Sequence, residues 1–527
     1  MGLDDISAGL IVYRASRLEA LLDPLLHLLA AHPPGHVLAP QSVIAAHPGM
    51  RHWLTAAVAR RQGPRGIAAN LEIVLPSAWL DGLARRQLGA AAVALEPYQR
   101  AQLRWRIHAR LPDLDAPQVR HYLQGADAAR RRFQLADRLA RLYSQYMVYR
   151  PDWLRAWAAG QDTRPAAGFI GPLWGQLRNE VGMPHRGELL ARLEAALLAS
   201  EGPAETEPLH VFGISHLAPA ELAVLRAVAR HRPVVLYVPD PCRTYWAGLR
   251  SDRALLRERV RADAAGHDTE ALFLEQGHPL LAAWGRMGQH FVLALEDSDL
   301  QVDVRHWRDE GAAADASHDA CEAPPGSLLR NVQESIRHCE PAWMAPHGDR
   351  AAQRDDRTLR VHACHTRLRE LEVLRDALLR EREARPDLKP GDIVVMAPDI
   401  QAYVPLLPSV FGEPGVMQGP LPYHLADVAV TRSHPLLQAF DQFLDLPTAR
   451  LTAPEVVDLL RVPEIARRFG LDAADVEQLA AWLGRSRVAW ALDADARARR
   501  GVPAIEAHTF AWGVDRMLAS YVYGADV

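Results

Sequence analysis

The sequence predicts an α/β fold made of two parallel-sheet domains, each interrupted by a helical insertion, with the second domain incomplete. Short apolar runs alternate with helical patterns at both ends of the first 295 residues, which is typical of parallel sheets. The same alternation returns after residue 357 and passes into a second helical stretch. At 527 residues the chain is also too long for a single hydrophobic core.

The composition is that of an ordinary globular protein. Hydrophobic residues make up 49%, charged residues 24%, and the net charge is −4. Because no global basic field points to nucleic acid, any such binding must come from local patches. The four cysteines contain no CxxC pair, which argues against zinc, an iron–sulfur cluster or a disulfide framework. The N-terminus is acidic and no apolar run is long, so we expect a cytoplasmic protein without membrane contact.

The first α/β domain is expected to begin in residues 1–75. The apolar run at 10–13 predicts a strand, and Ser16 with Glu19 has the pattern of a capping box that opens a helix through residue 29. A second strand is predicted at 37–39 and a second helix at 49–61. These elements have the order found at the start of a nucleotide-binding domain.

The turn after the first strand lacks the residues of a phosphate-binding loop. Such a loop needs glycines, whose amides approach phosphates, and a lysine followed by serine or threonine. The turn here reads Arg14, Ala15 and Ser16, and all but one of the 60 basic residues are arginines. Because the single lysine, Lys389, precedes a predicted strand, the sequence contains no Walker A motif. We therefore do not expect an autonomous ATPase.

A helical insertion is expected over residues 76–200, and its most informative part is residues 130–157. One face of this helix is predicted to be apolar and buried, namely Phe133, Leu135, Leu139, Leu142 and Tyr146. The other face carries arginines, namely Arg130, Arg131, Arg138 and Arg141. Pro151 should end the helix, which leaves Arg150 at a helix end, while Asp152 can cap the next helix. An ordinary amphipathic helix with a solvated arginine face is the alternative interpretation.

The first α/β domain is predicted to resume over residues 201–295. A strand at 209–213, a helix at 219–230 and a strand at 234–238 form a βαβ unit of a parallel sheet. The turn at 239–243 follows a strand end, where open sheets usually bind ligands, although a Pro-rich turn is more often only a turn. Residues 296–357 are acidic and rich in Ala and Pro, so we interpret them as a linker region broken by a helix at 328–338.

A second α/β domain is expected over residues 358–445, followed by a truncated helical insertion over 446–527. Its predicted elements are strands at 359–364 and 393–397, helices at 367–382 and 401–411, and a possible strand at 421–425. These strands are too few for a complete sheet.

No catalytic or metal site is predicted. His362, Cys364 and His365 alternate along a predicted strand, so their side chains point to opposite faces and a structural role is favoured over metal binding. Acidic pairs at 4–5 and 355–356 lie in predicted loops and do not suggest an independent nuclease. Tyr245 and Trp246 have two interpretations, which are stacking on a base or filling a domain interface.

The order of the domains looks like superfamily 1 helicase architecture without its phosphate loop, and particular strings resemble the RecC family, the gamma subunits of exodeoxyribonuclease V. The strings are GIAAN at 66–70, FQL at 133–135, QY at 145–146, VYRPDWL at 148–154, FGIS at 212–215, PCR at 241–243, YW at 245–246, PLL at 279–281, WG at 284–285, His362 with CH at 364–365, and SHP at 433–435. They span nearly the whole chain, but family members are longer, so the chain resembles only their N-terminal half.

The resemblance implies a catalytically inert, inactive helicase-like subunit of a heterotrimer with RecB-like and RecD-like motor subunits. ATP and Mg²⁺ are then used by those partners, and this chain holds no cofactor. In the family this subunit splits the arriving DNA duplex, guides the two strands, and scans the 3′-ended strand for the Chi recombination hotspot.

The family's Chi-reading positions match six residues, namely Gln41, Leu75, Leu142, Gln145, Arg150 and Arg186. Their chemistry suits the role, because glutamine reads base edges, leucine packs against a base and arginine binds phosphate or guanine. The family pattern is not kept at His52, Asp81, Arg141 and Ser144, and an insertion lies near residues 43–47. We therefore expect single-strand binding to persist and the recognised octamer to differ. Packing or helix capping remains the alternative for each matched residue.

Two other interpretations stay open at this point. A related AddB-type subunit has a similar inactive helicase architecture, although the phosphate-loop remnant and iron–sulfur cysteines associated with it are not seen here. A nonfunctional gene fragment is the other alternative, and its incomplete sheet should expose an unpaired edge and aggregate.

Overall fold

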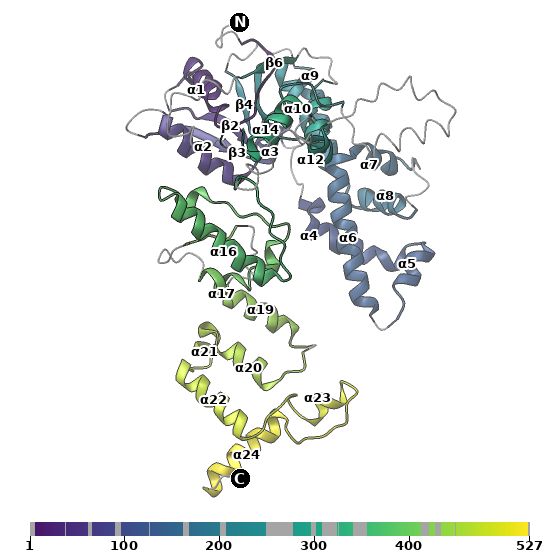
Figure 1. Ribbon diagram of the computed structural model, residues 1–527. Coiled ribbons are helices and arrows are strands. Elements are labelled where there is room, and N and C mark those ends of the chain that lie inside the picture. Colours follow the sequence, from purple (N-terminus) through teal and green to yellow (C-terminus); the bar gives the residue numbers. More distant parts are fainter. Residues whose placement is uncertain are drawn as a thin grey trace, which may run out of the picture. The chain divides into compact units, whose positions relative to one another are not determined.

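The computed structural model describes residues 6–36, 38–61, 66–89, 96–125, 127–161, 168–200, 207–248, 278–296, 302–307, 324, 326–340, 356–412, 421–426, 434–447 and 449–524. The chain divides into two compact units, Met1–Leu359 and Arg360–Val527. Each unit is described separately below (Figure 1).

The first unit is built on a six-stranded, all-parallel sheet with the order β3-β2-β4-β5-β1-β6. Its strands are β1 (Gly9–Ala15), β2 (Gln41–Ala45), β3 (Leu71–Val74), β4 (Leu209–Phe212), β5 (Pro233–Pro239) and β6 (Val302–His306). The central pair β1 and β5 is in register from Gly9 opposite Pro233 to Ala15 opposite Pro239. The parallel sheet confirms the predicted α/β fold class for this unit.

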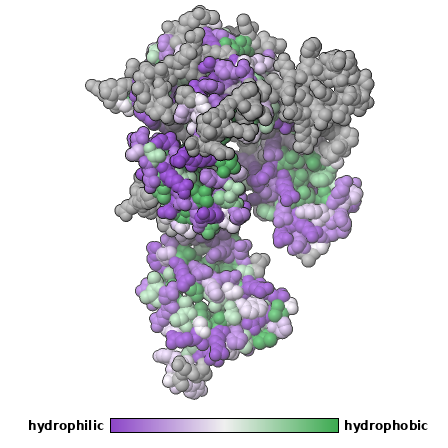
Figure 2. Space-filling view, in the orientation of Figure 1, coloured by the Kyte–Doolittle hydropathy of each residue, from purple (hydrophilic) through white to green (hydrophobic). Residues whose placement is uncertain are grey.

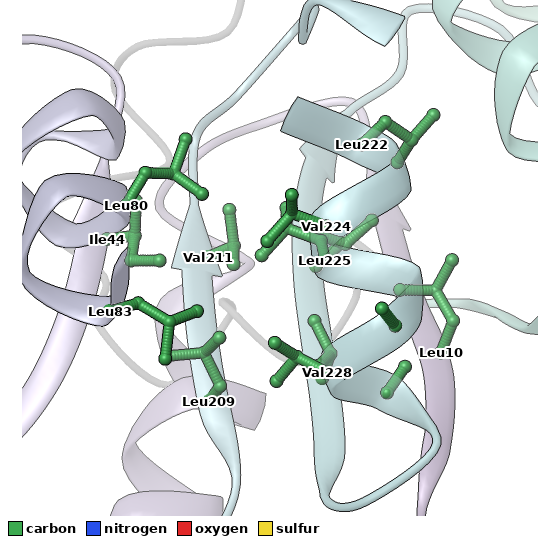
Figure 3. Packing of buried hydrophobic residues seen from close by; sticks show 14 of the residues in the cluster. Leu10, Ile44, Leu80, Leu83, Leu209, Val211, Leu222, Val224, Leu225 and Val228 are labelled. Atoms are coloured by element: carbon green, nitrogen blue, oxygen red, sulfur yellow. The ribbon is translucent and has the colours of Figure 1, made fainter. Parts of the chain in front are cut away.

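Both faces of the sheet are buried, so its central strands are continuously apolar. Leu10 and Val12 of β1 point to one face, which α3 (Pro76–Leu88), α9 (Arg186–Leu198), α10 (Pro219–Ala229) and α13 (Arg286–Glu296) cover. Figure 3 shows leucines and valines of α3 and α10 packed on these strands. Ile11 and Tyr13 point to the other face, beneath α1 (Leu22–Ala31) and α2 (Pro48–Arg61). The alternation along β1 thus builds two cores from one strand.

Four sequence-based expectations for this sheet need correction. Helix α1 begins at Leu22 without a side-chain cap, so Ser16 and Glu19 lie in a turn ahead of it rather than in a capping box. The second strand is β2 at Gln41–Ala45, and Leu38, in the segment predicted as that strand, is exposed. Val37 lies outside the described residues. Strand β3 was not predicted, and β6 lies inside the segment expected to be a linker. The helix predicted at 328–338 is confirmed as α14 (Leu328–His338).

The chain between β3 and β4 is helical in its described residues. Its remaining helices are α4 (Arg100–Arg110), α5 (Pro117–Tyr122), α6 (Ala128–Tyr149), α7 (Pro151–Ala158) and α8 (Ile170–Val181). Their core contains large aromatic side chains, among them Tyr143 and Trp174. The Tyr143 hydroxyl donates to the Ile170 carbonyl at 2.6 Å, and the Trp174 indole donates to the Leu154 carbonyl at 3.0 Å. Figure 1 shows α6 as the long helix on which the insertion is assembled.

The second unit is helical wherever regular structure is described. Its α-helices are α16 (Arg367–Ala384), α17 (Leu407–Phe411), α19 (Pro435–Asp445), α20 (Ala453–Leu460), α21 (Pro463–Arg468), α22 (Ala473–Arg485), α23 (Ala494–Ala498) and α24 (Phe510–Tyr523). Polar residues cap several of them, as Thr452 does for α20 and Asp472 for α22, each with a reciprocal bond from the third helical residue. A small apolar core lies among α20, α21, α22 and α24.

The second parallel sheet predicted for residues 358–445 is not found among the described residues. The predicted strands at 359–364 and 393–397 pair with no other strand that the structure describes. A strand is stabilised by backbone hydrogen bonds to neighbours and by burial of its apolar face. Here Val361 is 92% exposed and Met396 is 89% exposed. Only the helix between them, α16, agrees with the prediction, and α17 covers the end of the helix predicted at 401–411.

Candidate functional site

One face of α6 is a polar, basic surface. Its exposed residues follow a helical period of three to four and are Gln134, Arg138, Arg141, Gln145 and Tyr149. We call these five residues the α6 face. Neither Arg138 nor Arg141 forms an ion pair with any residue that the structure describes. The chain therefore presents two unneutralised guanidiniums beside two amides and a half-exposed phenol.

The buried side of α6 differs from the predicted apolar stripe. Its centre consists of Ala136, Leu139, Ala140, Tyr143 and Met147. Phe133, Leu135, Leu142 and Tyr146 were predicted to be buried but lie on its borders, partly exposed. The small side chains of Ala136 and Ala140 allow the neighbouring helices to approach closely there. Leu142, one of the six candidates, thus borders the α6 face, whereas Gln145 lies within it.

Arg150 does not reach outward from the end of α6 as predicted. Its Nε donates to Asp152 Oδ1 at 3.0 Å, and its guanidinium carbon lies 3.8 Å from the Trp153 ring centroid. These hydrogen bonds from Arg150 hold the pKa of the Asp152 carboxyl below its ordinary value. Asp152 therefore binds the arginine instead of capping α7, and the stacked pair is ordered at the end of the α6 face.

Arg186 at the first turn of α9 is also neutralised. Its Nη1 lies 3.1 Å from Asp81 of α3, and its Nη2 lies 3.6 Å from Glu221 of α10. The next residue, Gly187, touches α6, because an added Cβ would lie 2.8 Å from the Met147 carbonyl oxygen. Arg186 therefore lies near the end of α6, but its side chain belongs to the packing among α3, α6, α9 and α10.

Leu75 and Gln41 lie at opposite edges of the sheet. Leu75 follows β3 at the carboxyl edge and precedes the first turn of α3. Gln41 begins β2 at the amino edge, where its side-chain amide donates to the carbonyls of Leu29 at 2.8 Å and His32 at 3.3 Å. Both backbone acceptors come from the end of α1, so the Gln41 amide serves the fold. The six candidates therefore do not form one cluster.

The four residues that depart from the family pattern also lie in different places. Arg141 adds charge to the α6 face, while Ser144 donates from its hydroxyl to the Ala140 carbonyl within the same helix. His52 is exposed on α2. Asp81 binds Arg186. The expected insertion near residues 43–47 includes the buried end of β2.

The carboxyl end of β1, where a phosphate-binding loop would begin, is filled by the protein's own side chains. Arg14 is buried and lies 3.5 Å from Asp240, which follows β5. Asp240 also accepts from the Trp246 indole at 2.9 Å and from the Cys242 amide at 3.2 Å. This ion pair occupies the strand end at which open sheets usually bind ligands.

The structure also places the remaining motifs that the sequence singled out. Trp246 is buried, whereas the Tyr245 ring is exposed and its hydroxyl donates to Glu296. His362 and His365 are exposed and Cys364 is partly exposed, and the described residues contain no group of three or more His, Cys, Asp or Glu side chains that could hold a metal ion. Asp4, Asp5 and Asp355 lie outside the described residues.

Sequence reasoning missed part of this surface. Gln134 and Tyr149 were not proposed as site residues, although both continue the three-to-four spacing of Arg138, Arg141 and Gln145. That spacing was the available signal. Trp105 of α4, which is 54% exposed beside Phe133, was missed as well, and an isolated tryptophan in a helical pattern carries no comparable signal.

Two family models match the chain. "RecC, N-terminal domain" matches residues 10–339, and "RecBCD enzyme subunit RecC fourth domain" matches residues 433–527. These matches confirm the family resemblance inferred from the sequence strings.

Curated relatives named "RecBCD enzyme subunit RecC" align with almost the whole chain. The protein of Escherichia coli K12 is 30% identical over 97% of this chain and 47% of its own length. That of Haemophilus influenzae is 28% identical over 97% and 48%, and that of Mycobacterium tuberculosis H37Rv is 30% identical over 98% and 46%. The chain thus spans about half the length of the curated relatives it matches. Among the described residues, each helix is too short or too polar to cross a bilayer.

Proposed function

Because the chain belongs to the RecC family, we propose that it is a non-catalytic, DNA-binding subunit of an ATP-dependent helicase–nuclease. Such an enzyme acts in the repair of double-strand breaks by homologous recombination. In this proposal the first unit is an inactive helicase-like domain that splits duplex ends and guides single strands. The motor subunits, RecB-like and RecD-like, supply ATP hydrolysis and Mg²⁺ chemistry in the cytoplasm.

The α6 face is the feature that most directly supports DNA binding. Phosphates attract cations, and Arg138 and Arg141 are charges without partners among the described residues. Gln145 lies between them and Tyr149 along the helix, so an amide that can bond a base edge stands beside groups that can hold the backbone. Because the whole chain has a net charge of −4, attraction of DNA phosphates depends on local basic surfaces such as this one.

The carboxyl end of β1 supports a non-catalytic role. A motor would bind nucleotide phosphates there, through loop amides and a lysine. In this chain Arg14 and Asp240 bind each other at that place, and Trp246 covers Asp240. The side chains that stabilise the fold thus use the space that phosphates require.

We rank the six residues proposed to read a Chi-like sequence in the 3′-ended strand by the contacts that each side chain makes. We assign direct contact to Gln145 and Leu142, on and beside the α6 face, and phosphate or base stacking to the Arg150–Trp153 pair. Arg186 and Gln41 then act indirectly, since their polar groups already bind protein. Leu75 sets the start of α3, which carries Asp81 to Arg186.

Binding of the full chain to a 3′-tailed forked duplex and to a blunt duplex, measured by fluorescence anisotropy at two salt concentrations, tests this proposal. We expect preferential, salt-sensitive fork binding. The double variant Arg138→Ala/Arg141→Ala should weaken it and lower the slope of log K against log salt by roughly 0.7 for each lost phosphate contact. Arg60→Ala, at an exposed arginine of α2, is the control. Equal weakening by Arg60→Ala, or no binding by the folded chain, would contradict the proposal.

A further inference from the structure

An exposed tryptophan packs against α6 on the side next to the α6 face. Trp105 of α4 is 54% exposed, although its neighbours Leu103 and Ile107 are fully buried. Its ring centroid lies 5.4 Å from that of Phe133 on α6, and the imidazole of His108 meets it edge-on at 5.5 Å. Exposure of so large a ring costs apolar burial, so a ligand that covers it would recover that energy.

Arg104 holds this ring pair in place. Its guanidinium carbon lies 5.4 Å from the Trp105 centroid and 4.9 Å from the Phe133 centroid. The same guanidinium reaches Asp137 of α6 at 3.5 Å. The rings and the cation are therefore already ordered, and binding at this place requires little further loss of side-chain freedom.

The charge around Trp105 favours a polyanion as the ligand. Helices α4 and α6 together carry nine arginines and one carboxylate, Asp137. Arg100 and Arg104 share that carboxylate, and Arg106 and Arg110 share Glu180 of α8. Two pairs of arginines thus each share one acid. Hydrophilic residues cover this end of the insertion in Figure 2.

Helix geometry connects the ring pair to the α6 face. At about 100° per residue, Arg141 and Gln134 lie roughly 80° and 100° around α6 from Phe133. The ring pair and the α6 face therefore lie on adjacent sides of α6, about a quarter turn apart, with Asp137 between them. A strand whose phosphates contact Arg138 and Arg141 can turn a base toward Trp105.

We propose that Trp105, backed by Phe133 and Arg104, is a stacking platform for an unpaired base of single-stranded DNA. This rests on the proposed function, because it assumes that a strand crosses the α6 face. Stacking tolerates every base, so the platform holds the strand without reading its sequence, while Gln145 reads an edge farther along the helix.

The test uses the full chain and two labelled probes, a thymidine oligomer of about 20 nucleotides and an abasic sugar–phosphate oligomer of equal length. Trp105→Ala should weaken thymidine-oligomer binding by about 5- to 100-fold and leave the abasic oligomer unchanged. Trp105→Phe should bind nearly as the unchanged protein does. Trp284→Ala, which removes another exposed tryptophan of the same unit, is the control.

The outcomes separate this proposal from the broader one. Wild-type binding that Trp105→Ala leaves unchanged would overturn the platform and leave the DNA-binding role standing. Equal loss on both probes would show that Trp105 supports the surface without stacking. Unchanged DNA affinity, with self-association at high protein concentration that Trp105→Ala abolishes in sedimentation, would assign the ring to a protein contact and overturn the proposal. Absence of any binding by the wild-type chain would overturn both proposals.

Discussion

The guanidinium of Arg186 on α9 and the carboxylate of Asp81 on α3 form an ion pair at 3.1 Å. Arg186 matches a family position proposed to contact DNA, and Asp81 is one of the four positions at which the family pattern is not kept. The carboxylate of Asp81 therefore neutralises the guanidinium of Arg186. Glu221 of α10 lies 3.6 Å from the same guanidinium, and Arg186 is 18% exposed, so the cation is held mainly by protein carboxylates.

We therefore expect Arg186→Ala to act on stability. Its loss leaves Glu221 largely buried without its cation and should lower the free energy of unfolding by about 1–3 kcal/mol. Asp81→Ala should cost less than about 1 kcal/mol, because Asp81 is more exposed and Arg186 keeps Glu221. Urea unfolding and DNA anisotropy on both variants check this. A large loss of DNA affinity in folded Arg186→Ala would contradict the interpretation.

The two glutamines among the candidates should separate cleanly. Gln41→Ala removes hydrogen bonds to two carbonyls at the end of α1 and should lower the free energy of unfolding by about 1–2 kcal/mol, with unchanged DNA affinity. Gln145→Ala, on the exposed α6 face, should change stability by less than about 0.5 kcal/mol and weaken DNA binding severalfold. The measurements are urea unfolding and anisotropy on the same preparations. The reverse pattern would show that Gln41 meets DNA.

Gly187 should tolerate no side chain. An added Cβ would lie 2.5 Å from the Pro151 Cβ and 2.8 Å from the Met147 carbonyl oxygen, so α9 would have to move away from α6. We expect Gly187→Ala to lower the free energy of unfolding by about 1–3 kcal/mol. The matched control is Gly82→Ala within α3, where the added Cβ meets only the flexible Arg86 guanidinium at 3.6 Å. That change should stabilise the protein by up to about 1 kcal/mol. Thermal unfolding that shifts in the same direction for both variants would disprove the clash.

The centre of the first sheet, strands β1, β4 and β5, was predictable because these strands are buried on both faces. Leu10 to Tyr13 and Val234 to Val238 are continuous apolar runs, and such runs are visible without any tertiary information. The two edge strands, β3 and β6, were missed because they lack such continuous apolar runs. β3 contains Glu72 and β6 alternates Asp303 and Arg305 with valines, so neither stands out from a loop.

The candidate site was less predictable, since it depends on contacts between distant parts of the chain. The spacing of apolar residues identified α6, but Ala136 and Ala140 moved its buried centre away from the predicted stripe. The partner of Arg186 is 105 residues away in the sequence. Arg150, in contrast, is held by neighbours two and three residues onward, which the sequence displays but which periodicity does not reveal.

Acid should weaken the junction of α6 and α9 through His185. This side chain is fully buried at the start of α9, and its Nδ1 accepts from the Gly187 amide at 3.1 Å. In the neutral ring the proton therefore lies on Nε2. A second proton, on Nδ1, would remove the acceptor and break the hydrogen bond from the Gly187 amide. Burial lowers the pKa of His185 from 6.5 to about 4, although nearby Glu188 opposes this shift.

Because the folded pKa lies below the unfolded value of 6.5, the unfolded chain takes up a proton first. The stability due to the neutral ring is thus complete above pH 6.5 and is lost as the pH falls toward 4, by up to about 1.4 kcal/mol for each pH unit. His185→Asn keeps a cap acceptor and removes the titration. Free energies of unfolding from urea titrations between pH 7 and 4 should fall less steeply for this variant. Other titrating groups, such as buried His210, cancel in the comparison. Parallel profiles for the two proteins would contradict this prediction, because they would show that the pKa of His185 is the same in the folded and unfolded states.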